Sequence, residues 1–597
     1  MSLTALISRK YLCLVFLVAA FFAVLPYAHL YWKLGYEIPK LPVAVYNDAD
    51  YYFDRMQEVK DGYPFLGNPY FIEHREEVPP AFFLADWFSA IPLLLGVPLM
   101  TTIALNFFIW SFFFILLAYV LLRVLDVTGR WSFFGSLVVF SEVYLLMIRP
   151  VSMQVVFPLF LIFMIAYVVW LKDPESRKKQ VALALAAAFT AYIYTYAWQI
   201  VIVALGLTPV LFFVTDRRES IGSFFKVFGM FILASLPLVL YTMKQIAHPL
   251  YWETMQRIGL VNTHVPTAAV VYVSIWVVGM FCLWGLLSRH NTRHIGLMKI
   301  HDAAFPFFAV LGMAMVVVTC SNILSGKDLE LPQHIERFIV LWSGFASVYS
   351  CYFLSRKYEW QKFSRLALVL GSLCVAVVFV GNIHYLSIFG PGVIFDEQYD
   401  FERAKKIQGF DAPLVWLKEN AKEPAVIWAD PNGPLRGYVT MMTQHYILFS
   451  AGGGLHLVGQ DELDERYLVS HFFALTREDL IDDYHAYGGV GNAYHGWKTH
   501  NRKVKLCDLL LLGRLGCECG ELTDRETYIG AQYFTDLYER YRFEIKPNIN
   551  SYLEKYQVAY IIKDNETDRV EFQPMLIVGA KQVYNDGRFE IYSLQNF

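Results

Sequence analysis

The chain has 597 residues, of which 56% are hydrophobic and only 17% are charged, and its formal net charge is −3. Soluble domains carry about 25% charged residues, so this composition favours a membrane protein over a soluble one. The negative net charge and the lack of a basic stripe with interleaved aromatic residues argue against a nucleic-acid binder.

Eleven apolar runs follow one another through the first two thirds of the chain, each near the about 20 residues that a bilayer-crossing helix needs. They lie at about 11–32, 102–122, 131–148, 153–171, 181–196, 197–214, 225–243, 267–287, 302–320, 338–354 and 366–388. The first run exceeds the apolar region of a signal peptide and lacks a small-x-small cleavage site, so we expect it to remain as an anchor.

Basic residues gather before the first run and in every second gap between runs. These positions hold Arg9 and Lys10; Arg123 and Arg130; Lys172, Arg177, Lys178 and Lys179; Arg217, Arg218 and Lys226; Arg289, Arg293 and Lys299; Arg356, Lys357, Lys362 and Arg365. By the positive-inside rule the N-terminus is cytoplasmic, and the odd-numbered gaps and everything after residue 388 face outward. The fold class expected is a polytopic α-helical membrane protein of about 11 spans, with a membrane domain at 1–388 and a C-terminal extracytoplasmic domain at 389–597.

One further apolar segment, 81–100, tests the count of spans. Counting it as a span would invert every later loop and place all the basic clusters outside. Because it contains Asp86, Pro92 and Pro98, it suits an interfacial or re-entrant helix better than a lipid-exposed span. We therefore place it in the first outer loop, 33–101.

Acidic and aromatic residues alternate in this first outer loop, which is far longer than the about 12–15 residues of a passive connection. The densest stretch is Asn47-Asp48-Ala49-Asp50-Tyr51-Tyr52-Phe53-Asp54-Arg55, and Glu73-His74-Arg75-Glu76-Glu77 follows it. Two further outer loops supply Glu253, Arg257 and His264, and then His334, Glu336 and Arg337. Each group also has a structural alternative. The first stretch could be a solvated loop, Glu253 and Arg257 could form an i,i+4 ion pair, and Arg337 could be an arginine that reaches from the start of a span to the interface. Because acids, arginines and histidines from distant parts of the chain return to one membrane face, we favour a shared site.

The composition after Ile388 is that of a soluble protein. A helix at Asp411–Ala421, strands at Ala425–Trp428, Tyr446–Ser450 and Val558–Lys563, a helical stretch at Glu526–Tyr541 and a hairpin around Asn585-Asp586-Gly587 predict a small α/β domain. Asp430, His445 and the glycines at 452–454 are better explained as a turn, a core histidine and a loop than as ligand contacts. Cys507, Cys517 and Cys519 permit one disulfide, and the C-x-C spacing is a weak metal pattern.

The stretch from Asn47 to Phe53 is similar to the Asp-Ala-x-Tyr-Tyr motif that follows the first helix in oligosaccharyltransferase catalytic subunits. With the basic-led first span, the long first outer loop, the many further spans and the C-terminal domain, the chain resembles the GT-C superfamily of integral-membrane glycosyltransferases. The resemblance implies that Asp48 is the catalytic aspartate, with Asp50 as the second candidate. Glu253 is a loose match to the acidic residue that oligosaccharyltransferases carry in a late outer loop.

Two motifs of oligosaccharyltransferases are missing. The stretch 148–158 has no Asp-x-Asp, and Glu142 is the nearest acid, about 9 Å of helix below the outer surface. The Trp-Trp-Asp-Tyr-Gly motif is also absent. These departures count against a sequon-reading enzyme and favour a lipid-linked monosaccharide transferase, closer to the mannosyl- and aminoarabinosyl-transferase branches.

The resemblance implies inverting transfer of a hexosyl or pentosyl group from a polyprenyl-phosphate-linked donor in the bilayer to a glycan, lipid or protein acceptor. Asp48 would act as general base on the acceptor hydroxyl. The donor phosphate would be bound by Arg337, Arg257, Arg149 and His334, and the substrates by His74, Glu73, His264 and Tyr51. If the enzyme uses Mg²⁺ or Mn²⁺, the oxygen ligands would be Asp48, Glu142 and Glu253.

Two other classes of protein remain open. A polytopic transporter or flippase would explain the number of spans, but the halves of the membrane region show no clear repeat and most acids lie outside the spans. A non-catalytic surface protein would not need eleven spans as an anchor. A donor-dependent glycosyl-transfer assay separates the first class from both.

Overall fold

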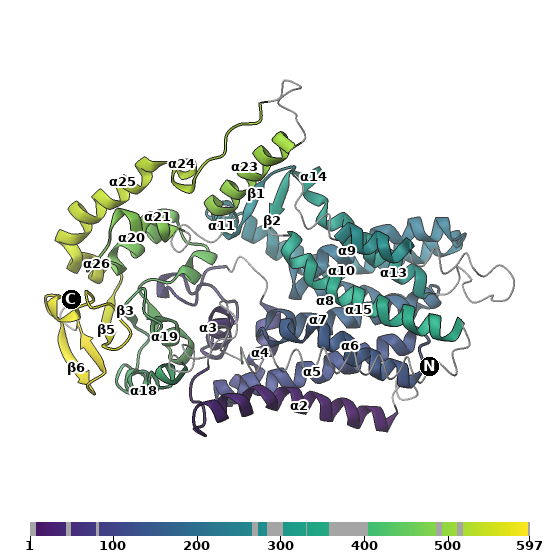
Figure 1. Ribbon diagram of the computed structural model, residues 1–597, viewed down its shortest axis with the longest axis horizontal. Coiled ribbons are helices and arrows are strands. Elements are labelled where there is room, and N and C mark those ends of the chain that lie inside the picture. The colour runs from purple at the N-terminus through teal and green to yellow at the C-terminus, as the bar shows by residue number, and fades with distance from the viewer. Residues whose placement is uncertain are drawn as a thin grey trace.

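The structure is a computed structural model, and it describes residues 8–42, 49–78, 83–265, 273–282, 303–329, 331–357, 404–484, 492–509 and 518–594. Figure 1 shows a bundle of long helices beside a C-terminal part that mixes helices with a sheet. The N-terminal end of helix α2 (Arg9–Lys33) lies at the end of the bundle that faces away from the C-terminal part.

Ten of the eleven predicted apolar runs contain a helix, and the eleventh, 366–388, lies outside the described residues. After α2 these helices are α5 (Leu99–Val124), α6 (Gly129–Ile148), α7 (Ser152–Lys172), α8 (Arg177–Ile193), α9 (Thr195–Val214), α10 (Ile221–Ile246), the helix Val273–Cys282, α13 (Ala304–Thr319) and α15 (Leu331–Lys357). Within the described residues, six helices are long and apolar enough to cross a membrane. The number of spans and their orientation remain predictions.

Helix α7 lies at the centre of the bundle, against α5, α8 and α13. Its aromatic side chains Phe163, Tyr167 and Trp170 are fully buried and follow one another down one face of the helix. The apolar core continues from the bundle into the C-terminal part, where it includes Phe410 and Phe589. The two parts of the molecule therefore share one packed core.

The first predicted outer loop contains α3 (Ala49–Lys60), the 3₁₀ helix η1 (Ile72–His74) and α4 (Leu84–Leu94). Helix α4 has 11 residues with Pro92 inside it, so it rises about 16 Å and is too short to cross a bilayer about 30 Å thick. Arg55 of α3 donates a hydrogen bond from Nη2 to Oδ2 of Asp86 in α4, at 2.6 Å. This buried ion pair joins α4 to α3, and the placement of 81–100 in an outer loop remains a prediction.

Two other predicted outer loops meet in a small antiparallel ladder. Strand β1 (Leu260–Asn262) pairs with β2 (Lys327–Leu329), next to the short helices α11 (Tyr251–Ile258) and α14 (Ser321–Ser325). Segments that are far apart in the sequence thus come together at the end of the bundle beside the C-terminal part.

The C-terminal part contains a five-stranded sheet in the order β4-β3-β5-β7-β6. The strands are β3 (Val426–Ala429), β4 (Tyr446–Ile447), β5 (Val558–Asp564), β6 (Lys581–Asn585) and β7 (Phe589–Ser593). Strand β3 is parallel to both β4 and β5, and the β5-β7-β6 segment is antiparallel.

Alternate residues of the strands enter different cores, because a strand has a period of two. Ile427 and Ala429 belong to the core that is shared with the bundle, whereas Val426 and Trp428 belong to a second core on the other face. The surrounding helices are α18 (Asp411–Asn420), α19 (Arg436–Met442), α20 (Gln460–Ser470), α21 (Arg477–Asp482), α23 (Asn492–Leu509), α24 (Arg525–Ile529), α25 (Ala531–Arg540) and α26 (Ile549–Lys555).

The expected helix 526–541 is broken in the structure. Gly530 has a positive φ of 110° and separates α24 from α25, where a residue without a Cβ adopts that conformation at low cost. A disulfide joins Cys507 to Cys519, one of the pairings that the three C-terminal cysteines allowed. Cys517 lies outside the described residues.

Candidate functional site

Helix α3 presents the acidic motif that the sequence singled out. Asp48 lies just before the helix and outside the described residues, so its role remains a prediction. Three residues of the first turn of α3, Asp50, Tyr51 and Tyr52, have different surroundings. Asp50 lies against Gly437 of α19, Tyr51 packs against Arg55 and His456, and Tyr52 lies under the guanidinium of Arg149. Helix α3 therefore connects the bundle with the C-terminal part at this motif.

Three of the four predicted phosphate-binding residues lie together at the end of the bundle next to α3. We name this set the basic–aromatic cluster; its members are Tyr52, Arg149, Tyr194, Tyr196, His334 and Arg337. All six residues are half-buried. They come from α3, the α6–α7 connection, the junction between α8 and α9, and the first turns of α15.

The hydroxyl of Tyr194 links two of the cationic candidates. Arg337 donates from Nη1 to this hydroxyl at 3.5 Å, and the hydroxyl is 2.5 Å from Nδ1 of His334. Because an arginine can only donate, the hydroxyl accepts from Arg337 and can donate its own proton to the imidazole. Arg149 also interacts electrostatically with this hydroxyl. The hydroxyl of Tyr194 thus interacts with the guanidinium groups of both Arg337 and Arg149.

The backbone explains why Tyr194 reaches this position. Tyr194 has extended torsions, with φ −158° and ψ 117°, and it ends α8 and begins α9. The interruption turns the hydroxyl toward α15 instead of leaving it on a continuous helix surface. Within the described residues, no carboxylate lies within 4.0 Å of the Arg337 guanidinium, so its charge faces a neutral hydroxyl. Such a half-buried guanidinium is suited to a phosphate oxygen.

A second group of polar residues lies on the other side of α3. Asp54 is buried and accepts a hydrogen bond from Thr440 of α19 at 2.9 Å, and burial raises its pKa well above its usual value. Glu58, one turn further, is also buried, and burial raises its pKa to about 8. Burial therefore favours the protonated form of both side chains, and Asp50 and Asp48 are the other acids of the motif.

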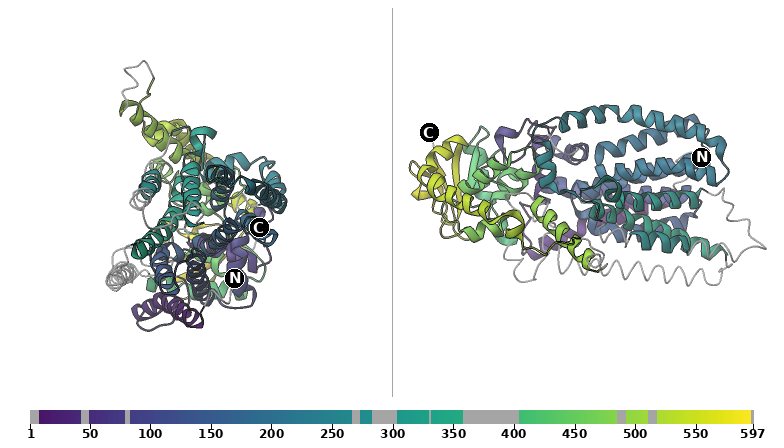
Figure 2. Two further views of the ribbon diagram at one scale, coloured as in Figure 1. Left: turned by 90° about the vertical axis from the view of Figure 1, so that its right-hand side faces the viewer. Right: turned by 90° about the horizontal axis from the view of Figure 1, so that it is seen from above.

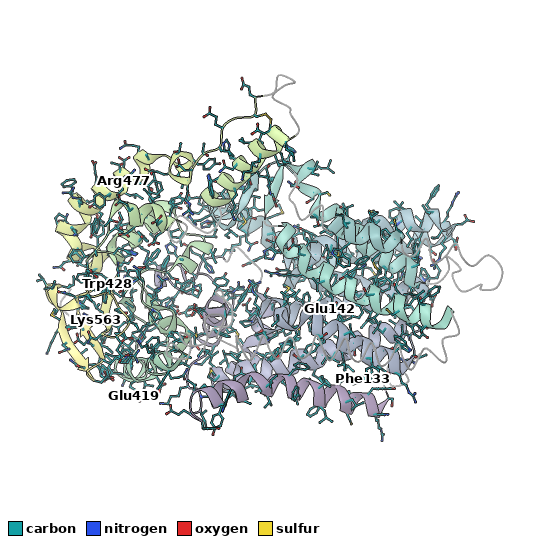
Figure 3. The ribbon with its side chains drawn as sticks, in the orientation of Figure 1. Phe133, Glu142, Glu419, Trp428, Arg477 and Lys563 are labelled. Atoms are coloured by element: carbon teal, nitrogen blue, oxygen red, sulfur yellow. A yellow bond between two sulfur atoms is a disulfide. The ribbon has the colours of Figure 1, made fainter. Side chains whose placement is uncertain are left out.

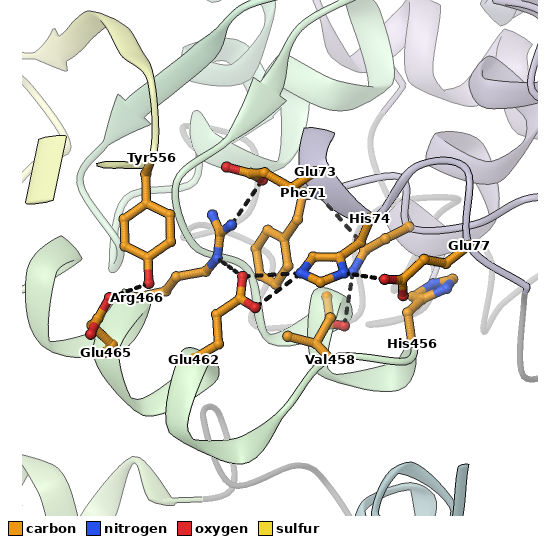
Figure 4. A network of polar contacts seen from close by, with 12 residues as sticks. Phe71, Glu73, His74, Glu77, His456, Val458, Glu462, Glu465, Arg466 and Tyr556 are labelled. Carbon is orange, nitrogen blue, oxygen red and sulfur yellow. Dashed lines mark hydrogen bonds and ion pairs between the residues drawn. The ribbon is translucent and has the colours of Figure 1, made fainter. Parts of the chain in front are cut away.

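Glu73 and His74 lie in a polar network between the first predicted outer loop and α20, shown in Figure 4. His74 is hydrogen bonded to Glu77 at 2.8 Å and to Glu462 at 3.0 Å. Arg466 donates to Glu73 and to Glu462, each at 2.8 Å. Its guanidinium lies between the rings of Phe71 and Tyr556, 4.3 and 4.1 Å from their centres.

The charges in this network stabilise one another. Burial alone would lower the pKa of His74, but its hydrogen bonds to Glu462 and Glu77 outweigh it and raise the pKa to about 9. Burial would raise the pKa of Glu462, but His74 and Arg466 lower it to about 2. Glu73 and His74 therefore connect two parts of the chain, and their contacts with Glu77, Glu462 and Arg466 do not involve the basic–aromatic cluster.

Arg257 and Glu253 form a second connection to the C-terminal part. The buried guanidinium of Arg257 donates to the carbonyls of Gly454, His456 and Val458, at 2.8, 3.2 and 2.5 Å. Glu253 accepts from Arg257 at 3.2 Å and from the backbone of Gln460 at 2.6 Å. The i,i+4 ion pair, which was the structural alternative for these two residues, is present. Three backbone carbonyls accept hydrogen bonds from Arg257, which was predicted to bind the donor phosphate.

The remaining candidates are spread over the molecule. His264 is exposed and lies 3.0 Å from the carbonyl of Ile323. Glu142 lies within the bundle (Figure 3), where the carboxylate faces Gly344 of α15. In the part of the chain that the structure describes, no group of three or more His, Cys, Asp or Glu residues could hold a metal ion. Glu142 and Glu253 have different neighbours, so the described ligands do not form one metal centre.

The sequence did not single out Tyr194 and Tyr196. Their signal is the polar and aromatic stretch Tyr192-Ile193-Tyr194-Thr195-Tyr196 between two apolar runs, which marks the end of one helix and the start of the next. Arg466 and Glu462 carried no comparable signal, because they lie in a charged helix of the C-terminal part.

No protein-family model and no curated protein sequence matches the chain. Among solved structures, the archaeal oligosaccharyltransferase of Archaeoglobus fulgidus in its apo form is similar over 93% of this chain and 70% of that one, with 11% identity and a TM-score of 0.35. The same enzyme tethered to an acceptor peptide with the NVT sequon, and in complex with an inhibitory peptide and a dolichol-phosphate, gives TM-scores of 0.36 and 0.39 at 10% identity, over 93% of this chain and 69% of that one. Similarity of this size is a general likeness of the chain path and assigns no activity to this chain.

Proposed function

We propose that the chain is an integral-membrane glycosyltransferase that moves a sugar from a polyprenyl-phosphate-linked donor to an acceptor hydroxyl on the extracytoplasmic face. The observation that carries the proposal is the basic–aromatic cluster beside the acidic motif of α3. Two arginines and a histidine at the end of an apolar bundle suit an anionic headgroup whose lipid tail lies in the bilayer.

The proposed reaction is a single displacement at the anomeric carbon of the donor sugar. The carboxylate of Asp48, or of Asp50, takes the proton of the acceptor hydroxyl, and the acceptor oxygen forms the new bond to the anomeric carbon. The bond between that carbon and the phosphate oxygen breaks, and polyprenyl phosphate leaves with the electron pair. Attack on the face opposite the leaving group inverts the anomeric configuration.

The cluster would act on the leaving phosphate. Arg337 and Arg149 would neutralise its charge, and His334 would donate a further hydrogen bond when protonated. Arg257 is held by backbone carbonyls, so we assign it to fixing the loop at 454–458. The proposed steps use only side chains of this chain.

The proposal is tested by transfer from labelled polyprenyl-phosphate-linked hexoses and pentoses in membranes that contain the protein. Mass spectrometry of lipids and glycans from cells with and without the gene identifies the sugar and the acceptor. We expect Asp48→Asn or Asp50→Asn to reduce transfer about 10²–10⁴-fold, as loss of a general base commonly does. Asp61→Asn, an exposed acid at the other end of the same loop helix, is the matched control and retains activity.

Transport of the lipid-linked sugar without cleavage of its bond to phosphate would instead identify the flippase alternative. Equal transfer by the wild type and by both aspartate variants would remove this motif from the mechanism.

A further inference from the structure

Helix α23 lies outside the outline of the helical bundle when the molecule is viewed along its long axis (Figure 2, left). It packs against α11, α24 and strand β1, and in Figure 1 it lies next to α14. Helix α14 follows α13 directly, so this level is where a bundle helix ends. In a bundle that crosses a bilayer, a helix beside the bundle at that level would lie over the surrounding lipid rather than over the bundle.

Specific contacts fix α23 in this place. Trp497 donates from Nε1 to the carbonyl of Thr523 at 2.6 Å, and the side chain of Asn501 exchanges two hydrogen bonds with the backbone of Thr523, at 2.9 and 3.0 Å. Near its C-terminal end, the disulfide from Cys507 to Cys519 joins the helix to the same segment. One face of α23 is therefore fixed to the segment 518–524 by hydrogen bonds and a disulfide.

A different face of α23 is exposed and combines basic side chains with a large apolar one. Lys498, Lys505 and Leu509 are spaced seven and four residues apart, so they lie on one face of the helix. Leu509 is 76% exposed at the end of the helix. Lys503 adds a further exposed cation and Asp508 an exposed acid to the helix, and the acids Glu518 and Glu521 lie on the segment bound to the other face.

The neighbouring helix α14 is also apolar where it meets solvent. Leu324 is 89% exposed and Ile323 is 42% exposed. Large exposed apolar side chains next to lysines are the composition of elements that lie in the membrane interface, where the lysines reach the headgroups and the apolar side chains enter the acyl boundary.

We propose that α23 lies on the bilayer around the bundle, with Lys498 and Lys505 binding anionic lipid headgroups and Leu509 entering the interface. This contact is independent of the proposed glycosyl transfer, because it uses none of the residues assigned to that reaction. It would fix the C-terminal part relative to the membrane surface, in addition to the contacts that α20 and α11 already make.

The test is amide hydrogen exchange of the full-length protein in nanodiscs made from phosphatidylcholine alone or mixed with phosphatidylglycerol. We expect exchange within 496–509 to be slower in the mixed discs. Lys498→Glu and Lys505→Glu should each reduce the protection about fivefold, since a basic residue near an anionic surface contributes about 1 kcal/mol. Lys581→Glu, with the same charge change on the exposed strand β6, is the control and leaves exchange in 496–509 unchanged.

A second measurement does not depend on charge variants. A nitroxide at position 509, introduced as Leu509→Cys in a background that keeps Cys507 and Cys519, should be more accessible to oxygen than to a polar relaxation agent. Exchange that is the same in both lipids, together with a fully water-exposed nitroxide, would overturn the proposal. Protection that appears only when two copies share a disc would also overturn it, because the partner would then be a second chain.

Discussion

The imidazole of His334 stacks face to face on the ring of Tyr196, with 3.9 Å between ring centres and 4° between ring planes. The stack fixes the orientation of the imidazole, and Nδ1 then meets the hydroxyl of Tyr194 at 2.5 Å. Since Arg337 donates to the same hydroxyl, two aromatic residues from one helix junction position two side chains of α15. The cluster is thus pre-organised by protein contacts.

Arg337 is predicted to bind the donor phosphate. Arg337→Ala should raise the KM for the donor about 10- to 100-fold, because a hydrogen bond to a charged group contributes about 1.5–3 kcal/mol. Arg337→Lys should recover part of the loss, since it keeps the charge but not the forked geometry. Donor titrations measure both effects, and Arg130→Ala, an exposed arginine at the start of α6, is the control.

Tyr194→Phe refines the same prediction, because it removes the hydroxyl that links Arg337 to His334 but keeps the ring. A neutral hydrogen bond contributes about 0.5–1.5 kcal/mol, so we expect a change of about 2- to 10-fold in donor use. If neither Arg337 variant alters donor affinity or rate, the arginine is only an interfacial anchor, and Arg149 becomes the remaining candidate of the cluster.

His74 is predicted to stabilise the contact with α20 in a pH-dependent manner. Its pKa is raised from 6.5 to about 9 by Glu462 and Glu77 against the effect of burial, so its stabilisation is complete below about pH 6.5 and is lost as the pH rises through about 9. The thermal midpoint of the wild type should exceed that of His74→Gln near neutral pH, and the difference should disappear above about pH 9.

His264→Gln is the matched control, because this exposed histidine is hydrogen bonded to a backbone carbonyl rather than to a carboxylate. A pH-dependent loss that appears for His74→Gln and not for His264→Gln would be assigned to the contacts with Glu462 and Glu77. A constant difference for His74→Gln across the same range would show that the ring packs at this contact without carrying a charge.

The helices could be predicted from the sequence, because an apolar run of about 20 residues has few stable structures other than a helix in a bilayer. The glycine-containing hairpin and the strand at Val426–Ala429 were also predictable, because turn residues and short apolar runs bounded by them are local signals. The short helix α4 followed from Pro92 and Asp86, which oppose a full span.

The pairings between distant segments could not be predicted. His74 and Glu462 are 388 residues apart, and no periodicity connects a loop histidine with a charged helix of the C-terminal part. The sequence offered an ion pair of Arg257 with Glu253 as an alternative to phosphate binding, and the pair is present, but the three backbone carbonyls that Arg257 also contacts belong to a loop about 200 residues later. In the same way, the position of Tyr194 depends on one extended residue between two helices, which composition does not reveal.

Gly452 and Gly453 are predicted to be needed for close packing rather than for flexibility. A Cβ at Gly453 would lie 2.4 Å from the ring of Phe71, so Gly453→Ala forces the first predicted outer loop away from the C-terminal part. Overpacking of this kind costs about 1–3 kcal/mol. Gly459→Ala is the control, because its nearest neighbour would be 4.0 Å away. Thermal unfolding should show a lower midpoint for the first variant only, and equal midpoints would mean that the loops separate readily.

The orientation of the chain is the last prediction, and the grouping of the proposed outer residues depends on it. Lys178 lies in the first turn of α8, whose other end reaches Tyr194 and the basic–aromatic cluster. Lys563 lies in β5 of the C-terminal part (Figure 3). The two positions therefore lie on opposite sides of the bundle, and the positive-inside rule places Lys178 in the cytoplasm.

A membrane-impermeant thiol reagent should label an introduced cysteine at 563 in intact cells, and label one at 178 only after the membrane is opened. Labelling at 178 from outside would invert the topology and place the acidic motif of α3 in the cytoplasm, where a nucleotide-activated sugar could replace the lipid-linked donor.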